Sequence, residues 1–376
     1  MKINLSAQQS SQGESIDTSR LQEVSEVPLA VKRVAFNALQ KEIQIPLEYN
    51  FERHGVTQSL LGAFRECPTK ARMKISGYYR PVTSIALSFG NMFHHLCEKI
   101  YTEVKNHKGD EKHSPLNMSE ILIEEMLRKD FKDEYERTPA SDREVLETSI
   151  MFCKALFPTY IEYWKQDFDG DKKKSWVALE KQFSMPIFGA IQDGSFIGKR
   201  DGEYKDQAGN LWLFETKTKS RWNELNLGMI VGRDLQVNSY MLAQHYDYGE
   251  RPVGVLYNVV RRPQLKIKKD ESKQEFFLRI KQDVKDRLDF YFVRLEVPIL
   301  WEHVQDFSDR FHVEVKEFRD WSKRDPKLDK QCSHVCENIY GPCDFLKYCA
   351  SGKTDTSGLN IRKKMFNELE VEEEMD

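Results

Sequence analysis

Apolar residues recur at helical spacing in several parts of the chain. Between residues 88 and 104 they lie three or four positions apart, at Phe89, Phe93, Leu96 and Ile100. This spacing predicts an amphipathic helix. The same spacing, interrupted by charged residues, predicts helices over 118–168 and from 272 to about 325. A shorter helix is expected after Thr57 and ends near Pro68, because proline disfavours helical backbone in the residue before it.

Residues 176 to 261 follow the shorter period of β-strands. Runs rich in Val, Phe, Ile and Trp are separated by Gly and Asp, a pattern typical of a β-meander. The predicted strands are Trp176–Ser184, Phe188–Gln192, Phe196–Tyr204, Leu211–Thr218 and, after a helix over 233–247, Pro252–Arg261. Residues 206–210 predict a hairpin turn. With the flanking helices, this order predicts an α/β fold, a mixed sheet flanked by helices.

The chain of 376 residues is long enough for two domains, or for one large domain with an appendage. Residues 1–25 are rich in Ser, Gln and Glu with almost no aromatic residues, so we expect a mobile tail. We divide the chain into a tail and lead-in (1–45), a core (46–270) with a helical insertion (106–170), a helical and cysteine-rich C-terminal lobe (271–350), and an acidic tail (351–376).

The composition indicates a globular chain. Hydrophobic residues make up 40% and charged residues 31% of it. No stretch approaches a membrane span, and no apolar run follows the first residues, so we expect a reducing, cytoplasmic location. The net charge of −3 argues at first against a nucleic-acid partner. However, residues 368–376 contain six acidic and no basic residues, which leaves 57 basic against 54 acidic residues in the rest of the chain.

Two acidic residues and a lysine form the most informative polar pattern. Side chains alternate along a strand, so Leu211, Leu213, Glu215 and Lys217 share one face, and Asp201 on the preceding strand can reach the same place. Two converging carboxylates repel each other unless a cation lies between them, and oxygen ligands suit Mg²⁺ or Mn²⁺. Lys217 would then lie beside a metal-bound water, where it could orient that water or help stabilise the charge that develops on the phosphate, a set of groups suited to phosphodiester hydrolysis. The same spacing also fits an ordinary solvated strand end.

Six motifs, in one order, carry a resemblance to a known family. They are Ser59–Arg72 (SLLGAFRECPTKAR), Gly90–Glu98 (GNMFHHLCE), Gly198–Gly202 (GKRDG), Glu215–Lys217 (ETK), Gln236–Tyr240 (QVNSY) and the cysteines of Cys336–Cys349. Over about residues 57–350 the chain resembles RecB-type nucleases of the PD-(D/E)XK superfamily. The most similar members contain an iron–sulfur cluster and act in CRISPR adaptation, in helicase-nucleases or as phage or mitochondrial single-strand exonucleases.

The resemblance implies a PD-(D/E)XK nuclease core and a role for each motif residue. The implied metal ligands, for Mg²⁺ or Mn²⁺, are the side chains of His94, Asp201 and Glu215 and the backbone carbonyl of Thr216. The implied catalytic lysine is Lys217. The family's helix that positions the lysine and the nucleic acid is matched by Gln236 and Tyr240. The family spacing of Gly, three residues and His selects His94 rather than His95.

The chain has seven cysteines, and their clustering near the C-terminus indicates a metal site rather than disulfides in a reducing compartment. The resemblance implies a 4Fe–4S cluster that joins the two ends of the nuclease domain. Its implied ligands are Cys67, Cys336, Cys343 and Cys349, with Cys332 as the alternative to Cys336.

A competing interpretation is a local structural Zn²⁺ site. Its ligands would be Cys332, Cys336, Cys343 and Cys349, with or without His334. This interpretation leaves Cys67 without a role. Cys97 and Cys153 lie on predicted apolar helix faces, so we expect both to be core residues.

These observations predict a metal-dependent nuclease that hydrolyses DNA, a single-strand-preferring exonuclease more than an endonuclease, in phage or bacterial recombination, repair or processing. The expected partners are single-stranded DNA and a helicase or recombination protein, since the chain has no helicase motif of its own. RNA remains an alternative substrate. The alternative function is a catalytically idle relative that binds nucleic acid or a partner and carries structural zinc.

Overall fold

The computed structural model describes residues 45–81, 84–106, 118–168, 174–190, 193–221, 224–338 and 341–366, and Leu369. The chain divides into two units, Met1–Ile45 and Pro46–Asp376, and the fold below is that of the second. The predicted N-terminal tail and nearly all of the acidic segment 368–376 lie outside the described residues. No helix in the described ranges is both long and apolar enough to cross a membrane.

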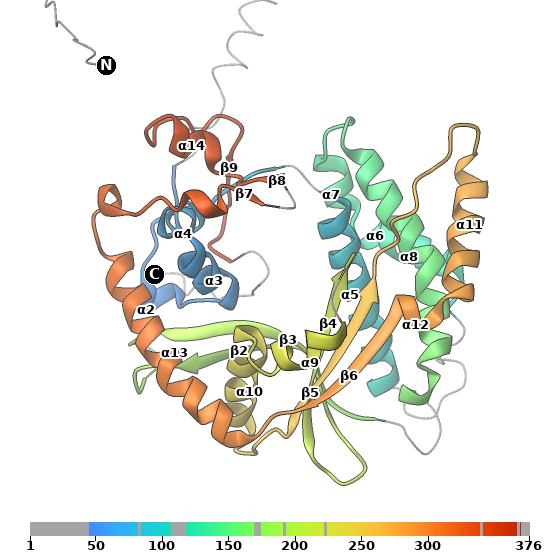
Figure 1. Cartoon of the computed structure of the whole chain (residues 1–376), viewed down its shortest axis with the longest axis horizontal. Helices are drawn as coiled ribbons and strands as arrows, with labels where there is room; N and C mark the ends of the chain where they lie inside the picture. The colour runs from blue at the N-terminus through green and yellow to red at the C-terminus, as the bar shows by residue number, and fades with distance from the viewer. Residues whose placement is uncertain are drawn as a thin grey trace, which may run out of the picture. The chain divides into compact units, whose positions relative to one another are not determined.

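A five-stranded mixed sheet separates two layers of helices (Figure 1). Its strands in spatial order are β2 (Ser175–Pro186), β3 (Ser195–Lys205), β4 (Leu211–Lys219), β5 (Gly254–Arg261) and β6 (Phe292–Pro298). Neighbours are antiparallel except β4 and β5, which run parallel. A parallel pair needs a long crossover, and here it contains α9 (Glu224–Val231) and α10 (Leu235–Tyr248). The predicted α/β class with a mixed sheet is confirmed.

The predicted helices 88–104 and 118–168 cover one face of this sheet. They correspond to α5 (Ile85–Asn106), α6 (Glu120–Asp130), α7 (Lys132–Arg137) and α8 (Arg143–Tyr163), followed by a 3₁₀ turn, Lys165–Asp167. Helix α11 (Lys273–Asp286) packs against α8. Phe93 and Phe157 from the helices and Phe214 and Leu256 from the sheet are buried in one shared core. The burial of these aromatic and aliphatic side chains holds α5 on the sheet.

A second helical layer covers the opposite face. It consists of α10, α2 (Phe51–His54), α3 (Gln58–Glu66), α4 (Pro68–Ile75) and α13 (Trp301–Ser322). The Thr57 hydroxyl accepts a hydrogen bond from the Leu60 N–H at 3.2 Å and so begins α3. Helix α3 ends at Glu66, and after the single residue Cys67 the next helix, α4, begins at Pro68, since proline is favourable in the first turn of a helix. The core of this layer includes Leu61, Leu213 and Phe311.

Two sequence predictions are wrong. The stretch from 272 to 325 is not one helical region, because α12 (Leu288–Tyr291) and β6 lie between α11 and α13. From residue 293 the apolar residues alternate with charged ones, and this period of two fits an edge strand paired with β5. The predicted strand Phe188–Gln192 is a bend over 188–190, while 191–192 lie outside the described residues. Gly189 and Gly194, with φ of +101° and +103°, turn the chain there instead.

The C-terminal segment returns to the start of the described unit. It contains 3₁₀ turns at Pro326–Leu328 and Ser333–Val335, the short hairpin β7 (Glu337–Asn338) and β8 (Gly341–Pro342), helix α14 (Leu346–Ala350) and β9 (Asn360–Ile361). Strand β9 pairs antiparallel with β1 (Tyr78–Tyr79), with Tyr78 opposite Ile361. This pairing places residues 360–361 beside residues 78–79 of the N-terminal part of the unit.

Candidate functional site

The site predicted from the sequence lies where β3 and β4 stop pairing. The last paired residues are Gly202 and Phe214, so Asp201 and Glu215 are the next residue on each strand. The Thr216 N–H donates a hydrogen bond to Asp201 Oδ2 at 2.8 Å, across the point where the ladder ends. A sheet opened in this way exposes polar groups that a continuous ladder would cover, and it brings both carboxylates to one place.

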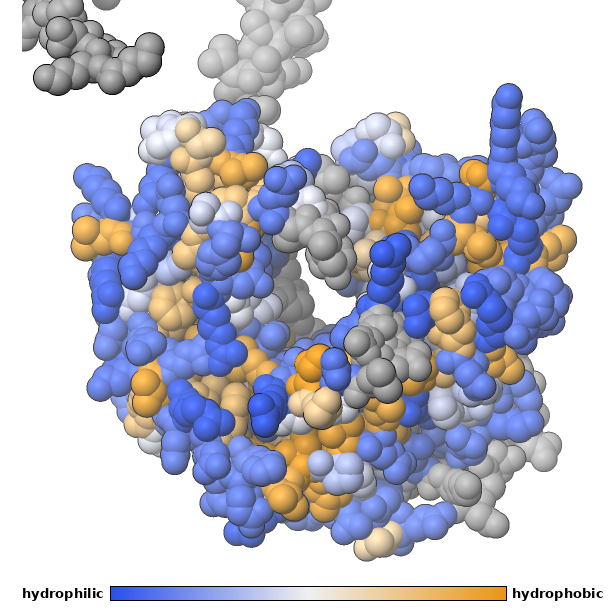
Figure 2. All heavy atoms as spheres, viewed as in Figure 1, coloured by the Kyte–Doolittle hydropathy of each residue, from blue (hydrophilic) through white to orange (hydrophobic). Residues whose placement is uncertain are grey.

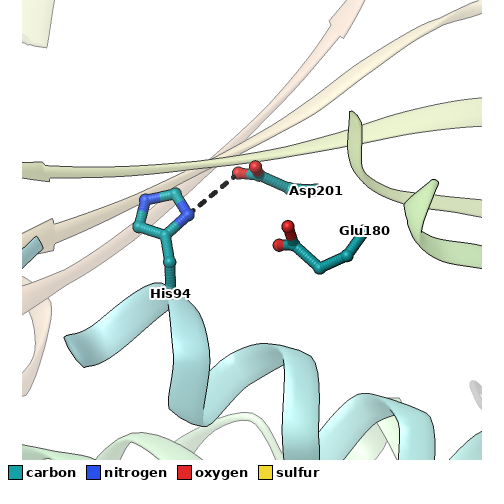
Figure 3. Close-up of side chains that lie close together, drawn as sticks. All are labelled: His94, Glu180 and Asp201. Atoms are coloured by element: carbon teal, nitrogen blue, oxygen red, sulfur yellow. Dashed lines mark ion pairs between the residues drawn. The ribbon is translucent and has the colours of Figure 1, made fainter. Parts of the chain in front are cut away.

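Helix α5 delivers His94 to this place. A Cβ at Gly90 would lie 2.9 Å from Thr218 Oγ1, so the glycine allows the helix to lie against β4. His94 is one turn further along the helix and therefore on a neighbouring part of the same face. Its Nδ1 lies 3.4 Å from Asp201 Oδ2, as Figure 3 shows.

Lys217 is fixed between a strand and a helix. Its Nζ donates to Glu215 Oε1 at 2.5 Å and to Gln236 Oε1, on the first turn of α10, at 2.6 Å. Tyr240, one turn further along α10, is buried and interacts with Gln236. The structure therefore brings together all the predicted residues of strands and helices at one site: His94, Asp201, Glu215, Thr216, Lys217, Gln236 and Tyr240. Thr216 contacts Asp201 through its N–H. The role of the Thr216 carbonyl as a metal ligand stays a prediction.

The charged groups at the site shift one another's pKa values. Burial and the neighbouring Asp201 raise the pKa of Glu215 to about 7. Burial opposes the charge on Asp201 as well, but His94 and Lys217 outweigh it and lower the pKa of Asp201. Burial likewise opposes the charge on Lys217, yet Glu215 and Asp201 raise the pKa of Lys217 above its usual value. The lysine is therefore a cation, and the carboxylates compete for positive charge.

One residue of the site was missed from the sequence. Glu180 lies on β2 directly opposite Asp201, between the pairs Leu179–Gly202 and Lys181–Arg200. Its φ of +45° is rare for a residue with a side chain. One ligand atom each of His94, Glu180 and Asp201 lies within 4.8 Å of the others, and Figure 3 shows the three side chains converging from α5, β2 and β3. Only the pairing register of β2 and β3 could have indicated this, and the sequence does not fix that register.

Arg200 was also not expected. Its side chain is completely buried, with Nε 2.6 Å from Glu203 and Nη2 2.5 Å from Asp247 of α10. Since a buried charge requires paired partners, Arg200 fixes α10 against β3. That position in turn places Gln236 beside Lys217.

The donor set fits a divalent cation. Glu215 is 1% exposed, and its Oε2 is buried without a hydrogen-bond partner. An unsatisfied buried carboxylate oxygen is costly, and a cation would satisfy it. Carboxylate oxygens with one imidazole suit Mg²⁺ or, better, Mn²⁺.

The predicted cluster cysteines converge at a second place. Cys67, the residue that joins α3 to α4, is close enough to Cys332 to raise the pKa of that thiol, in addition to the effect of burial. The thiol of Cys349 is close enough to Cys67, Cys336 and Cys343 for them to raise its pKa, in addition to the effect of burial. The Cys343 N–H donates to the Cys336 carbonyl at 2.8 Å. Both candidates for the ambiguous ligand, Cys332 and Cys336, therefore lie in this group.

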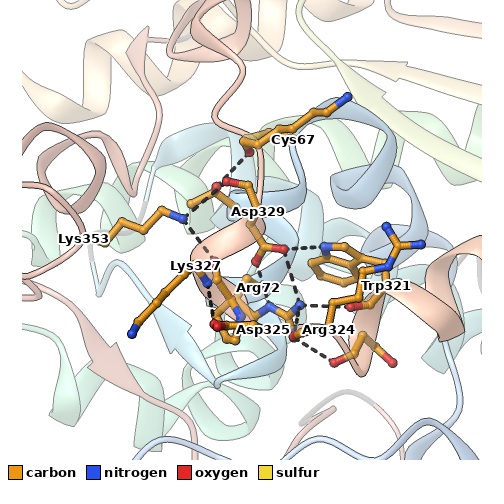
Figure 4. A network of polar contacts seen from close by, with 12 residues as sticks. Cys67, Arg72, Trp321, Arg324, Asp325, Lys327, Asp329 and Lys353 are labelled. Atoms are coloured by element: carbon orange, nitrogen blue, oxygen red, sulfur yellow. Dashed lines mark hydrogen bonds and ion pairs between the residues drawn. The ribbon is translucent and has the colours of Figure 1, made fainter.

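A polar network holds the two halves of this cysteine group together (Figure 4). Arg72 of α4 forms an ion pair with Asp329 at 2.8 Å, and the side chains are 13% and 2% exposed. Trp321 Nε1 donates to the same carboxylate at 2.6 Å. The Thr69 hydroxyl donates to the Lys330 carbonyl at 2.8 Å. This network fixes the segment just before Cys332 against the helix that begins beside Cys67.

The other two cysteines behave as predicted. Cys97 of α5 and Cys153 of α8 are buried in the core that these helices share with the sheet, and burial is the main cause of their raised pKa values. They are core residues, separate from the cysteine group.

Comparison of the sequence with models of known protein families gives no match, and comparison with curated proteins gives none either.

Proposed function

We propose that this protein is a metal-dependent nuclease of the RecB type that hydrolyses phosphodiester bonds in DNA, with single-stranded DNA as the preferred substrate and an exonuclease mode of action. The observation that carries the proposal is the convergence of His94, Asp201, Glu215 and Lys217 at the end of the β3–β4 ladder. A histidine, two acids and a lysine in this arrangement are the groups that phosphodiester hydrolysis needs.

In this proposal His94, Asp201 and Glu215 hold a Mg²⁺ or Mn²⁺ ion. The bound cation supplies positive charge to the phosphate and lowers the pKa of a water molecule. The residues of the chain position the reacting groups. Lys217 remains protonated because of Glu215 and Asp201, so it acts as a donor to the developing charge on the phosphate rather than as a base. Gln236 holds the ammonium in place through its 2.6 Å contact.

Basic residues beyond the site support a nucleic-acid substrate. Strand β5 runs parallel to β4, and Lys219 lies opposite Arg261 at the same end of the sheet as Lys217. The Arg262 N–H donates to the Lys219 carbonyl at 2.9 Å, so the chain continues from the site into a basic segment, which contains Arg261, Arg262, Lys266, Lys268 and Lys269. Positive charge along such a path favours binding of a phosphate backbone.

We also propose that the cysteine group holds a 4Fe–4S cluster. In a zinc site with Zn–S bonds of about 2.3 Å, four sulfurs lie within roughly 4 Å of one another. No three of the described cysteines bring their sulfurs within 4.8 Å of one another, whereas an iron–sulfur cluster separates its thiolates more widely. The interaction of Cys67 with Cys332 supports a site that includes Cys67. Anaerobic purification should give a brown protein with equal amounts of iron and acid-labile sulfide. A colourless protein with one zinc ion would contradict this assignment.

The test of the nuclease proposal is the cleavage of end-labelled single- and double-stranded DNA with and without Mn²⁺. Lys217→Met should lower the single-strand cleavage rate at least 10²-fold, the usual effect of removing a transition-state donor. Lys205→Met, at the far end of the same ladder and paired with Glu250, is the matched control and should cleave normally. Equal cleavage rates for the two variants would refute the role of Lys217.

A further inference from the structure

Glu180 lies at the candidate site, but the proposed function gives its carboxylate no role. The residue lies on β2, outside every motif of the sequence resemblance. Its side chain is only 12% exposed, which is unusual for an acidic residue. It is nevertheless directed at the same space as His94 and Asp201 (Figure 3).

The three side chains have the spacing of a metal-binding group. Two ligands on an octahedral ion with bonds of about 2.1 Å lie roughly 3 to 4 Å apart. His94 Nδ1 and Asp201 Oδ2 are 3.4 Å apart, and all three ligand atoms lie within 4.8 Å of one another. In the part of the chain that the structure describes, no other set of His, Cys, Asp and Glu side chains meets this condition.

The surroundings of Glu180 suit a ligand. Lys199 Nζ lies 2.6 Å from Glu180 Oε2 and neutralises the carboxylate in the absence of a cation. A carboxylate has two oxygens, so this contact leaves the second one free. Asp201 is similarly fixed, since the Thr216 N–H holds its Oδ2. Both acids are thus oriented before any ion binds.

A further observation is independent of this group. Glu215 Oε2 is buried without a hydrogen-bond partner, and its carboxylate is coupled electrostatically to Asp201 and His94. Glu215 lies on β4 and Glu180 on β2, on either side of Asp201 on β3. The unsatisfied oxygen of Glu215 therefore indicates that the space between these three carboxylates accommodates positive charge. Lys217 contacts only Glu215 Oε1, so Glu215 Oε2 still faces the cation of the proposed function, and Glu180 adds a further ligand rather than replacing Glu215.

We infer that Glu180 is a further ligand of the divalent cation bound by His94, Asp201 and Glu215, and that this set of one imidazole and three carboxylates binds Mn²⁺ more tightly than Mg²⁺. The inference rests on the proposed function, from which it takes the cation at His94 and Asp201. The preference follows from the nitrogen donor, because Mg²⁺ favours oxygen ligands alone whereas Mn²⁺ accepts imidazole more readily.

The experiment is calorimetric titration of the full chain with MnCl₂ and with MgCl₂, without nucleic acid. Glu180→Gln should weaken Mn²⁺ binding at least tenfold, the lower limit for loss of a group that supports a metal site. Glu250→Gln is the matched control, because Glu250 also pairs with a lysine of β3, Lys205, but lies away from the site. It should bind Mn²⁺ like the wild type.

A second variant covers the case in which Glu180→Gln does not fold. Glu180→Asp keeps the charge but shortens the reach, so it should bind Mn²⁺ several-fold more weakly than the wild type. Unchanged Mn²⁺ affinity in either folded variant, with loss of binding in His94→Ala, would overturn the role of Glu180. Cleavage assays separate this result from the proposed function: a wild type that cleaves DNA beside a Glu180 variant with normal affinity refutes only the ligand assignment. A wild type that binds Mn²⁺ through Glu180 without cleaving refutes only the nuclease.

Discussion

Arg72 is predicted to be the main link between α4 and the segment that carries the C-terminal cysteines. Its guanidinium contacts Asp329 and also donates to the carbonyls of Trp321, Ser322 and Arg324 at the end of α13. It lies 4.3 Å from the centre of the Trp321 ring. The substitution Arg72→Met keeps the apolar part of the side chain and removes all of these donors, so Asp329 would remain as a buried charge.

The expected cost can be estimated from these contacts. Removing one partner of a buried ion pair costs about 3–5 kcal/mol, and a desolvated cation–π contact contributes up to about 2 kcal/mol. The Arg324 carbonyl lies in an exposed environment, so water can replace that hydrogen bond. We therefore expect Arg72→Met to lower the free energy of unfolding by about 4 kcal/mol.

The assay is denaturant unfolding of wild type and variants, followed by far-UV circular dichroism. Arg65→Met is the matched control. Arg65 of α3 forms an ion pair with Glu314 of α13, so it also links the N-terminal helices to α13, but its side chain is 45% exposed. An exposed pair contributes at most about 1 kcal/mol. If Arg72→Met lowers the free energy of unfolding no more than Arg65→Met does, the Arg72 network does not hold α4 to the segment that carries the C-terminal cysteines.

Three further predictions follow from the site. Burial raises the pKa of Glu215 to about 7, so in the metal-free protein the free energy of unfolding falls as the pH rises from about 4.5 to 7. Mn²⁺ requires the ionised carboxylate, so the increase in the protein's melting temperature on adding Mn²⁺ should be larger at pH 8 than at pH 6. Gly90→Ala should lower the free energy of unfolding by about 1–3 kcal/mol through overpacking and weaken Mn²⁺ binding. Adding Thr218→Ala to this variant should restore part of both the stability and the Mn²⁺ affinity. A double variant without any recovery would contradict the close packing of α5 against β4. Cys67→Ala should lose most of the iron measured in the purified protein, whereas Cys97→Ala should retain it; equal iron contents would exclude Cys67 as a ligand.

The regular elements near the site follow from local pattern. Helix α5 carries apolar residues at every third or fourth position, and strands β3 and β4 flank a turn at 206–210, so their positions were predictable. The strand β6 was not, because Phe292 continues the apolar stripe of the preceding helix and the change of period begins only at the next residue. Its pairing with β5 is a tertiary contact, and such contacts override local pattern.

The candidate site was predictable only as far as its motifs reach. Asp201, Glu215 and Lys217 are close in sequence, so strand geometry alone brings them together. Glu180 depends on the register of β2 against β3 and on a left-handed backbone at that residue, and neither follows from the local sequence. Arg72 and Asp329 are 257 positions apart, so their contact depends on how the whole unit closes.

Asp201 lies in the centre of the proposed nuclease site, where it contacts both His94 and the Thr216 N–H. The most direct measurement is the rate at which wild type and Asp201→Asn cleave end-labelled single-stranded DNA in Mn²⁺, with EDTA as the metal-free reference. We expect cleavage by the wild type in Mn²⁺ alone and at least a 10²-fold loss in the variant, with an unchanged circular dichroism spectrum. Cleavage by the folded variant at the wild-type rate would show that Asp201 has no part in a metal-dependent nuclease reaction.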